Sequence, residues 1–222
     1  MQLFADRKDA GRRLGERLAE ILGDQKVVLI GLPRGGVPVA YEVARILHAP
    51  LDFIMVRKVG VPWQPEVAMG ALGEDDVLVV EPDTVKISNV SGPEFQRAVT
   101  AERKELRRRL RTYRGRRPPM RLEGQVVVIV DDGLATGATA QAACEVARAR
   151  GANRVIVAVP ISSDGAATRI EHVADELVTL RRVGGPFAVG QWYEDFAATS
   201  DEEVIEDLKS MPADGSRDGP SS

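Results

Sequence analysis

The fold is decided by Val126-Val-Val-Ile-Val130 and the segment that follows it, Asp131-Asp-Gly-Leu-Ala-Thr-Gly-Ala-Thr139. The first five residues are all apolar, which is typical of a strand that is buried on both faces of a parallel sheet. The second segment places glycines and threonines where a helix begins, so that backbone N–H groups can approach an anion closely. Ligands of open α/β sheets bind beyond the carboxyl ends of the strands. The stretch therefore predicts an anion site at such an edge.

The same order of apolar run and helical segment recurs along the chain. Other short apolar runs are Val27–Leu32, Leu51–Val56, Val155–Pro160 and Glu176–Leu180. Helical spacing is found from the N-cap Asp6 to Gly23, over Val37–Leu47, and from the glycine-rich segment to about Arg150. Strands that are apolar on both faces and are followed by helices indicate a parallel sheet covered on both sides. We expect an α/β fold with a doubly wound, mostly parallel sheet flanked by helices.

Residues 59–121 interrupt this alternation and predict an insertion. Val59–Ile87 contains prolines, glycines and short β-prone runs, which indicate an inserted hairpin or mobile loop. A long helix is predicted from Ser91 to about Arg114, because a proline lies near its start and Gly115 follows its end. Whether the segment 59–76 or the segment 97–121 would be a mobile loop of the site stays open.

Length and composition indicate one ordinary globular domain. The 222 residues are 44% apolar, so we expect a single domain over residues 1–210 and a disordered tail over 211–222. One cysteine, Cys144, excludes a disulfide framework, and two histidines, His48 and His172, make a histidine-based zinc enzyme or a Ser-His-Asp hydrolase improbable. No apolar run is long enough to span a membrane, and the N-terminus lacks a signal-type segment, so we expect a cytoplasmic protein without a membrane partner.

The charge of the chain is unevenly distributed. The total is −3, but residues 97–121 hold eleven arginines and lysines against Glu102 and Glu105, a local net charge of +9 that leaves −12 for the rest. A basic helix of this kind attracts anions to a nearby site, binds the acidic surface of a second subunit, or contacts nucleic acid. Few aromatic residues are interleaved with its charges, so we expect nucleic acid to be the least favoured of these partners.

Two carboxylates directly before an anion site need an explanation of their own. Asp131 and Asp132 would repel a phosphate that touched them, but carboxylates accept hydrogen bonds from a diol or from water around Mg²⁺. A phosphate at one end and a diol at the other describe a ribose 5-phosphate. No lysine follows the second glycine and the pattern G-x-G-x-x-G is absent, so neither a Walker loop nor a dinucleotide fingerprint is indicated.

The segment Val128–Thr139 resembles the signature of type I phosphoribosyltransferases, in the version found in adenine-phosphoribosyltransferase-like enzymes. The resemblance implies that Asp131 and Asp132 hold the ribose hydroxyls of phosphoribosyl pyrophosphate, and the chemistry of the two carboxylates makes them the expected Mg²⁺ site, directly or through water. The resemblance also implies a small hood over the sheet and a homodimer, which is the common arrangement in the family. The residues that it assigns to the 5-phosphate are Ala135, Thr136, Gly137, Ala138 and Thr139.

Two further segments offer cations and backbone donors for a pyrophosphate group. Gly31-Leu-Pro-Arg-Gly-Gly36 lies between a predicted strand and a helix, and arginine is suited to bidentate phosphate binding. By resemblance, Arg34, Gly35 and Gly36 bind pyrophosphate, and the bond Arg34–Gly35 is a cis peptide. Arg57 and Lys58 end the next strand and resemble an arginine–lysine pair that contacts pyrophosphate in the family. Arg34, Arg57 and Lys58 are thus the expected catalytic residues, acting electrostatically with Mg²⁺.

A hood over about residues 181–198 is expected to recognise the acceptor base. The segment Phe187-Ala-Val-Gly-Gln-Trp-Tyr-Glu-Asp-Phe196 resembles the hood of 6-oxopurine enzymes. By that match Phe187 stacks on the base, and Glu194 or Asp195 contacts an exocyclic group. Trp192 completes this set of base-binding candidates, although Phe187 and Trp192 are equally expected to pack a C-terminal helix onto the core.

Two departures weaken the match to 6-oxopurine enzymes. Ala135 stands where such enzymes usually place an acid, and Pro160-Ile-Ser-Ser163 stands where they place a lysine. The acceptor is therefore expected to be another nitrogenous base, or there is none.

Three functions remain open at this point. The first is the Mg²⁺-dependent transfer of ribose 5-phosphate from phosphoribosyl pyrophosphate to a base, with release of pyrophosphate. The second is a regulatory protein that binds phosphoribosyl pyrophosphate or a nucleotide without turnover. The third is a nucleic-acid-binding protein that uses the basic helix of residues 97–121.

Overall fold

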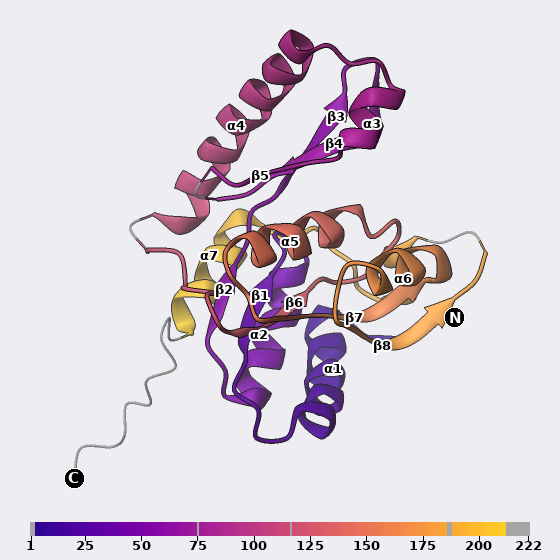
Figure 1. The fold of residues 1–222 in the computed structure, drawn as a ribbon. Helices are drawn as coiled ribbons and strands as arrows, with labels where there is room; N and C mark the ends of the chain where they lie inside the picture. The colour runs from indigo at the N-terminus through magenta and orange to yellow at the C-terminus, as the bar shows by residue number, and fades with distance from the viewer. Residues whose placement is uncertain (1–2, 75, 116, 186–187, 212–222) are drawn as a thin grey trace.

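The protein is built on a five-stranded parallel sheet, seen in a computed structural model that describes residues 3–74, 76–115, 117–185 and 188–211. The strands follow the order β2-β1-β6-β7-β8 across the sheet, and every neighbouring pair is parallel (Figure 1). Their bounds are β1 (Val28–Gly31), β2 (Leu51–Phe53), β6 (Val126–Val130), β7 (Arg154–Ser163) and β8 (Glu176–Val183). All five apolar runs of the sequence thus form strands, and β7 and β8 extend three residues further than expected.

Helices cover both faces of this sheet, as Figure 1 shows. One face is covered by α1 (Arg7–Leu22) and α2 (Gly36–Leu47), with α7 (Asp201–Ser210) packed against α2. The other face is covered by α5 (Ala138–Ala149) and α6 (Asp164–Glu171). The expected doubly wound α/β fold is therefore confirmed.

Alternate residues of each strand feed two separate cores. On β1, Leu29 packs into the core beneath α1 and α2, whereas Val28 and Ile30 pack into the core beneath α5 and α6. All these side chains are buried, which accounts for the unbroken apolar runs. The predicted cap of α1 is present, because the Asp6 carboxylate accepts a hydrogen bond from the Asp9 N–H.

The expected insertion forms a lobe beside the sheet (Figure 1). It contains an antiparallel sheet of the order β3-β4-β5 and two helices. Their bounds are β3 (Arg57–Val61), β4 (Gln64–Leu72), β5 (Leu78–Val80), α3 (Pro82–Ile87) and α4 (Gly92–Arg114). The predicted long helix is confirmed, with a capping box between Ser91 and Glu94. The inserted hairpin is a three-stranded sheet, and α3 has no counterpart among the expected elements.

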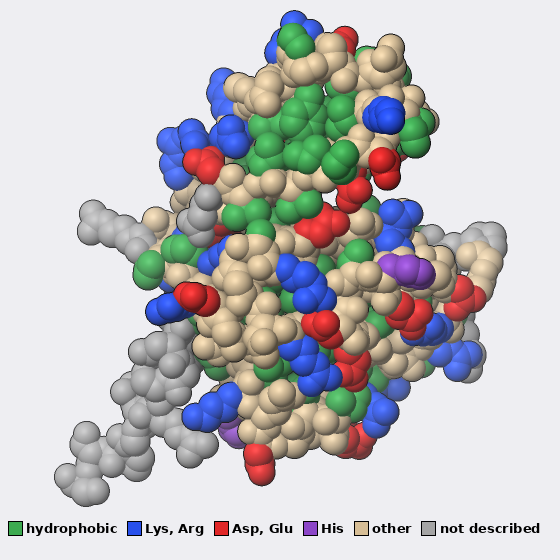
Figure 2. Space-filling view, viewed as in Figure 1, with side chains coloured by type: hydrophobic (Ala, Val, Ile, Leu, Met, Phe, Trp, Pro, Cys, Tyr) green, Lys and Arg blue, Asp and Glu red, His purple; other side chains and the backbone are tan. Residues whose placement is uncertain are grey.

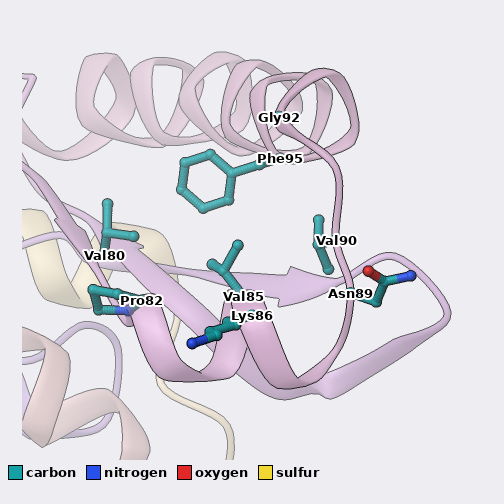
Figure 3. Close-up of a pocket in the computed structure, with 8 residues that line it drawn as sticks. All are labelled: Val80, Pro82, Val85, Lys86, Asn89, Val90, Gly92 and Phe95. Carbon is teal, nitrogen blue, oxygen red and sulfur yellow. The ribbon is translucent and has the colours of Figure 1, made fainter.

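The insertion has an apolar hollow on its outer face. Figure 2 shows hydrophobic side chains gathered there, and Figure 3 shows the hollow between α3 and α4. It has a volume of about 410 Å³ and includes Val80, Val85, Val90 and Phe95 in its lining.

Within the described ranges, no helix is long and apolar enough to cross a membrane.

Candidate active site

Two loops meet at the carboxyl edge of the central sheet. Strands β1 and β6 are parallel neighbours, with Gly31 opposite Val130. The Leu32 N–H donates to the Val130 carbonyl at 2.9 Å, which joins the chain after β1 to the chain after β6. The segment 33–36 and the segment 131–137 therefore lie side by side, as the sequence predicts for consecutive loops at one sheet edge.

The Asp132 carboxylate is held by an arginine from the start of the chain. Arg7, in the first turn of α1, places Nε and Nη2 each 2.9 Å from Oδ2 of Asp132. Arg7 also donates to the Ala197 carbonyl at 2.7 Å and stacks 4.0 Å from the centre of the Phe196 ring. The Tyr193 hydroxyl donates to the Asp132 backbone carbonyl at 2.6 Å. One residue of the acidic pair is thus fixed by α1 and by the segment after β8.

Arg7 and Tyr193 are site residues that the sequence analysis missed. Arg7 lies 125 residues before Asp132 and looks like an ordinary charged residue of a helix start. Tyr193 lies inside the expected hood segment, but nothing in that segment shows that its hydroxyl faces a backbone carbonyl. Only the fold brings these groups together.

Partial burial disfavours the charged form of both carboxylates of the acidic pair. It raises the pKa of Asp131 well above its usual range, and the negative charge of Asp132 raises it further. Burial also raises the pKa of Asp132, while the charge and hydrogen bond of Arg7 oppose this. Such carboxylates are stabilised by any ligand that brings hydroxyl donors or a cation to them.

The glycine-rich loop is anchored to the end of β7 and leaves donors free for an anion. Leu134 exchanges backbone hydrogen bonds with Ile161 and Ser163 at 2.9 Å, and the Ser163 hydroxyl donates to the Ala135 carbonyl at 2.8 Å. Gly137 has a φ of 75°, which favours glycine, and α5 begins directly after it. No acceptor from the described residues faces the N–H groups of Thr136 and Gly137. With the α5 N-terminus, they form an anion cradle.

The cis peptide expected at Arg34–Gly35 lies one bond earlier. The bond Pro33–Arg34 is cis, and the expectation by resemblance was therefore wrong by one residue. Arg34 lines a cavity with residues of α4 and α7, and no residue of the glycine-rich loop is among those that line it.

Arg57 and Lys58 separate in space. Arg57 is bound by Glu102 of α4, with Nη2 2.6 Å and Nε 2.7 Å from Oε2. Lys58 instead lines a groove of about 570 Å³ together with Thr136, its Nζ lying 3.2 Å from the Glu66 carbonyl. The structure thus brings Lys58 to the glycine-rich loop but leaves Arg34 in a different cavity and Arg57 in an ion pair.

The expected base-binding residues are only partly within the described residues. Phe187 lies outside them, as do residues 212–222 of the expected tail. Trp192, at the end of the short helix η1 (Val189–Trp192), packs with Phe4 and Tyr193, in a cluster that contains no residue of the C-terminal helix α7. Glu194 and Asp195 are exposed, and Asp195 lines a cavity of about 210 Å³ together with Arg7.

The acidic pair is the candidate for holding a divalent cation. Among the described residues there is no group of three or more histidine, cysteine, aspartate or glutamate side chains that would hold a metal alone. Mg²⁺ typically uses one or two carboxylates and takes its other ligands from substrate phosphates and water. Asp131 and Asp132 supply that number of carboxylates, so the donor set fits Mg²⁺ bound together with a phosphorylated ligand.

Comparison with known proteins agrees with this geometry. The family model described as "Phosphoribosyl transferase domain" matches residues 3–193. The Mycobacterium tuberculosis protein named "Putative phosphoribosyl transferase Rv0571c" is 52% identical over 205 residues, 92% of this chain and 46% of that protein. The chain thus spans about half the length of this relative. The crystal structure of TT1426 from Thermus thermophilus is 44% identical with a TM-score of 0.86, covering 94% of this chain and 98% of that one. The chain therefore belongs to the phosphoribosyl transferase domain family that its segment Val128–Thr139 resembles.

Proposed function

We propose that the protein transfers ribose 5-phosphate from phosphoribosyl pyrophosphate to a nitrogenous base, releases pyrophosphate and depends on Mg²⁺. The observation that carries this proposal is the continuity of the site: a half-buried acidic pair and an anion cradle follow one strand, β6. A ligand with a diol and a phosphate on one ring matches that order of groups.

Each part of the ligand has a proposed partner. Asp131 and Asp132 accept hydrogen bonds from the ribose hydroxyls, which offsets the cost of partly burying two carboxylates. The 5-phosphate lies in the cradle of residues 135–139, where backbone N–H groups and the α5 dipole favour an anion. Arg7 holds Asp132 in place for this contact.

The proposed chemistry is displacement at C1 of the ribose. A nitrogen lone pair of the base forms the new bond to C1 while the bond from C1 to the pyrophosphate oxygen breaks, and its electrons leave with pyrophosphate. The proton of the attacking nitrogen passes to solvent. Negative charge grows on the leaving group, so Arg34 and Lys58 act electrostatically. Arg57 joins them only when it leaves Glu102. Mg²⁺, held by Asp131 and Asp132 directly or through water, supplies further positive charge to the phosphates when it is bound.

The acceptor base is proposed to differ from a 6-oxopurine. The Ala135 side chain cannot accept a proton, and the Ser163 hydroxyl is bound to the Ala135 carbonyl. Pyrophosphate release with a panel of purines and pyrimidines tests this proposal. Turnover of hypoxanthine or guanine at ordinary rates would contradict it, and binding of phosphoribosyl pyrophosphate without turnover on any base would favour a regulatory protein.

The variant Asp131→Asn/Asp132→Asn should bind phosphoribosyl pyrophosphate with Mg²⁺ roughly a hundredfold more weakly than wild type. Two charged acceptors are lost, and each hydrogen bond to a charged group contributes on the order of 1.5 to 3 kcal/mol. Calorimetric titration measures the affinity, and Asp83→Asn on the exposed face of α3 is the control. Equal affinity of the double variant and wild type would exclude the proposed ribose site.

In the variant Arg7→Gln, the loss of affinity for phosphoribosyl pyrophosphate on acidification (the acid limb of binding) should occur at higher pH than in wild type. Arg7 holds the pKa of Asp132 down against burial, so its removal raises that pKa, and protonation then removes the acceptor at a higher pH. A raised folded-state pKa means that protonation stabilises the fold, so unfolding does not cause the loss. Titrations across a pH series measure the shift, with the exposed Arg12→Gln as the control. An unmoved acid limb would show that Arg7 does not tune Asp132.

A further inference from the structure

The apolar hollow of the insertion is separate from the groove at the glycine-rich loop, and α3 contributes to both. Thr84 lines the groove that also contains Lys58 and Thr136. The next two residues, Val85 and Lys86, line the hollow instead. The two cavities have no lining residue in common. The hollow is therefore a cavity that the proposed transfer reaction does not use.

The turn from α3 to α4 shapes the hollow. Asn89 has a φ of 51°, in the left-handed region. Its N–H donates to the Lys86 carbonyl and the Val90 N–H donates to the Val85 carbonyl, each at 3.1 Å. This pattern is the Schellman motif, in which the residue after the left-handed one packs against the end of the helix. Figure 3 shows Val85 pointing from α3 toward the Phe95 ring of α4, so the hollow lies between two fixed helices.

The hollow leaves apolar side chains in contact with water. Val80 is 40% exposed, and Val85 and Phe95 are only partly buried. Gly92 also lines the hollow, and a Cβ atom there would meet nothing within 4 Å. A cavity of about 410 Å³ with a mostly apolar lining and a few polar groups is typical of a site for a small ligand.

The polar side chains in the lining carry a positive charge. They are Lys86 and Asn89, and no carboxylate lines the hollow. Neither side chain makes a hydrogen bond or an ion pair with any residue that the structure describes. The Lys86 ammonium group is thus an unpaired cation beside apolar surface. A ligand that joins a hydrocarbon group to a carboxylate is complementary to this lining in both shape and charge.

We propose that the apolar hollow binds a small apolar carboxylate, with its hydrocarbon group between Val85 and Phe95 and its carboxylate at Lys86. The hydrocarbon removes the side chains of Val80, Val85 and Phe95 from water. The carboxylate gives Lys86 an ion pair. Because Lys86 is exposed, this pair selects the charge of the ligand, whereas the apolar contact supplies most of the affinity.

Three compounds with the same hydrocarbon chain test the proposal: octanoate, 1-octanol and octylamine. Their affinities are measured by NMR titration of the full chain at neutral pH and constant ionic strength. Octanoate should bind roughly two- to fivefold more tightly than 1-octanol, which is the range of an exposed ion pair, and octylamine should bind most weakly. Hexanoate should bind roughly four- to fifteenfold more weakly than octanoate, because it lacks two methylene groups.

Gly92→Leu should bind octanoate roughly tenfold or more weakly than wild type, because the leucine side chain occupies space at the hollow. Gly165→Leu is the matched control: it also replaces a glycine in the first turn of a helix, where a Cβ atom would meet nothing within 4 Å. It lies outside the hollow and should keep the wild-type affinity. Thermal unfolding of both variants checks that the fold is retained.

Lys86→Glu should reverse the preference for the charge of the ligand, so that octylamine binds more tightly than octanoate. A loss of structure would weaken both ligands and could not produce this reversal. Lys104→Glu makes the same change at an exposed position of α4 outside the hollow and should keep the preference for octanoate.

Three results would overturn the inference: no binding of octanoate by wild type, equal affinities of wild type for octanoate and octylamine, or unchanged binding of octanoate by Gly92→Leu. Sedimentation velocity supplies a fourth. A wild-type dimer that Gly92→Leu dissociates would show that a second copy of the chain, and not a carboxylate, fills the hollow.

Discussion

Arg114→Met should lower the free energy of unfolding by about 3 to 5 kcal/mol, because it leaves two buried carboxylates without their cation. Arg114, at the end of α4, lies between Asp52 of β2 and Glu74 after β4, whose side chains are 1% and 3% exposed. Its Nη1 lies 3.1 Å from Oδ1 of Asp52 and its Nη2 lies 2.8 Å from Oε1 of Glu74. The guanidinium also stacks 4.2 Å from the centre of the Phe53 ring.

Urea unfolding measures this loss. The difference in free energy of unfolding between wild type and Arg114→Met should become smaller as the pH falls. Burial raises the pKa of Glu74 and Arg114 opposes this, so the variant raises that pKa further. A raised folded-state pKa gives a contribution to stability that is present at low pH and is lost as the pH rises. Protonation of Glu74 therefore removes part of the uncompensated charge in the variant.

Two further variants separate charge from packing. Arg111→Met, on an exposed position of the same helix, should change stability by less than about 0.5 kcal/mol. Asp52→Asn/Glu74→Gln keeps acceptors for the N–H groups of Met120 and Met55, so adding Arg114→Met in this background should cost much less. The same large loss in both backgrounds would show that packing on Phe53, and not charge, dominates.

The central sheet was predictable because a strand that is buried on both faces is an uninterrupted run of apolar residues. Strand β6 is five apolar residues in a row, and the same pattern locates its neighbours. The helix α4 was predictable because its capping residues and Gly115 lie at its ends. These signals involve residues that are close together in the chain, so they can be recognised in a single sequence.

The insertion was harder to predict because its strands are buried unevenly. Strand β4 changes from exposed to buried along Gln64–Leu72, and a bulge near Gly60 shifts its register with β3. Gly60, Pro65 and Gly70, which indicated an inserted hairpin or a mobile loop, belong to an antiparallel sheet. No periodic pattern marks this arrangement.

The candidate site likewise has one part that the sequence predicts and another that it does not. Asp131 to Thr139 are consecutive, so the sequence brings the acidic pair and the anion cradle together without any knowledge of the fold. Arg7 reaches the acidic pair from the start of the chain, where only tertiary packing decides its neighbours. The separation of Arg57 from Lys58 depends on carboxylates of the insertion, Glu102 and Glu66.

The structure also changes the interpretation of the charge of the basic segment 97–121. Much of its charge is matched within the chain: Arg107 by Asp76, and Arg114 by Asp52 and Glu74. These acids lie outside the segment, so its net charge of +9 overstates the field that an external partner meets. Arg108 and Arg109 share the carboxylate of Glu105 and line one cavity with Arg34.

Gly35→Ala should weaken binding of phosphoribosyl pyrophosphate roughly tenfold, with the fold retained, because it displaces the Asp132 carboxylate. A Cβ atom at this position would lie 2.0 Å from Oδ2 of Asp132 and 3.0 Å from Nε of Arg7. The end of a side chain can move away from such a clash, but this end is fixed by two nitrogens of Arg7 at 2.9 Å. The added methyl group must therefore separate Asp132 from Arg7 or shift both.

A double-mutant cycle identifies the carboxylate as the cause. In an Asp132→Ala background the clashing atoms are absent, so adding Gly35→Ala should cost almost no further affinity for phosphoribosyl pyrophosphate. Gly165→Ala, where a Cβ atom would meet nothing within 4 Å, should bind as wild type does. If Gly35→Ala costs as much affinity in the Asp132→Ala background as in wild type, the methyl group acts on the ligand itself. The glycine would then serve close approach of the backbone to the ligand, and Asp132 would tolerate a neighbour with a side chain.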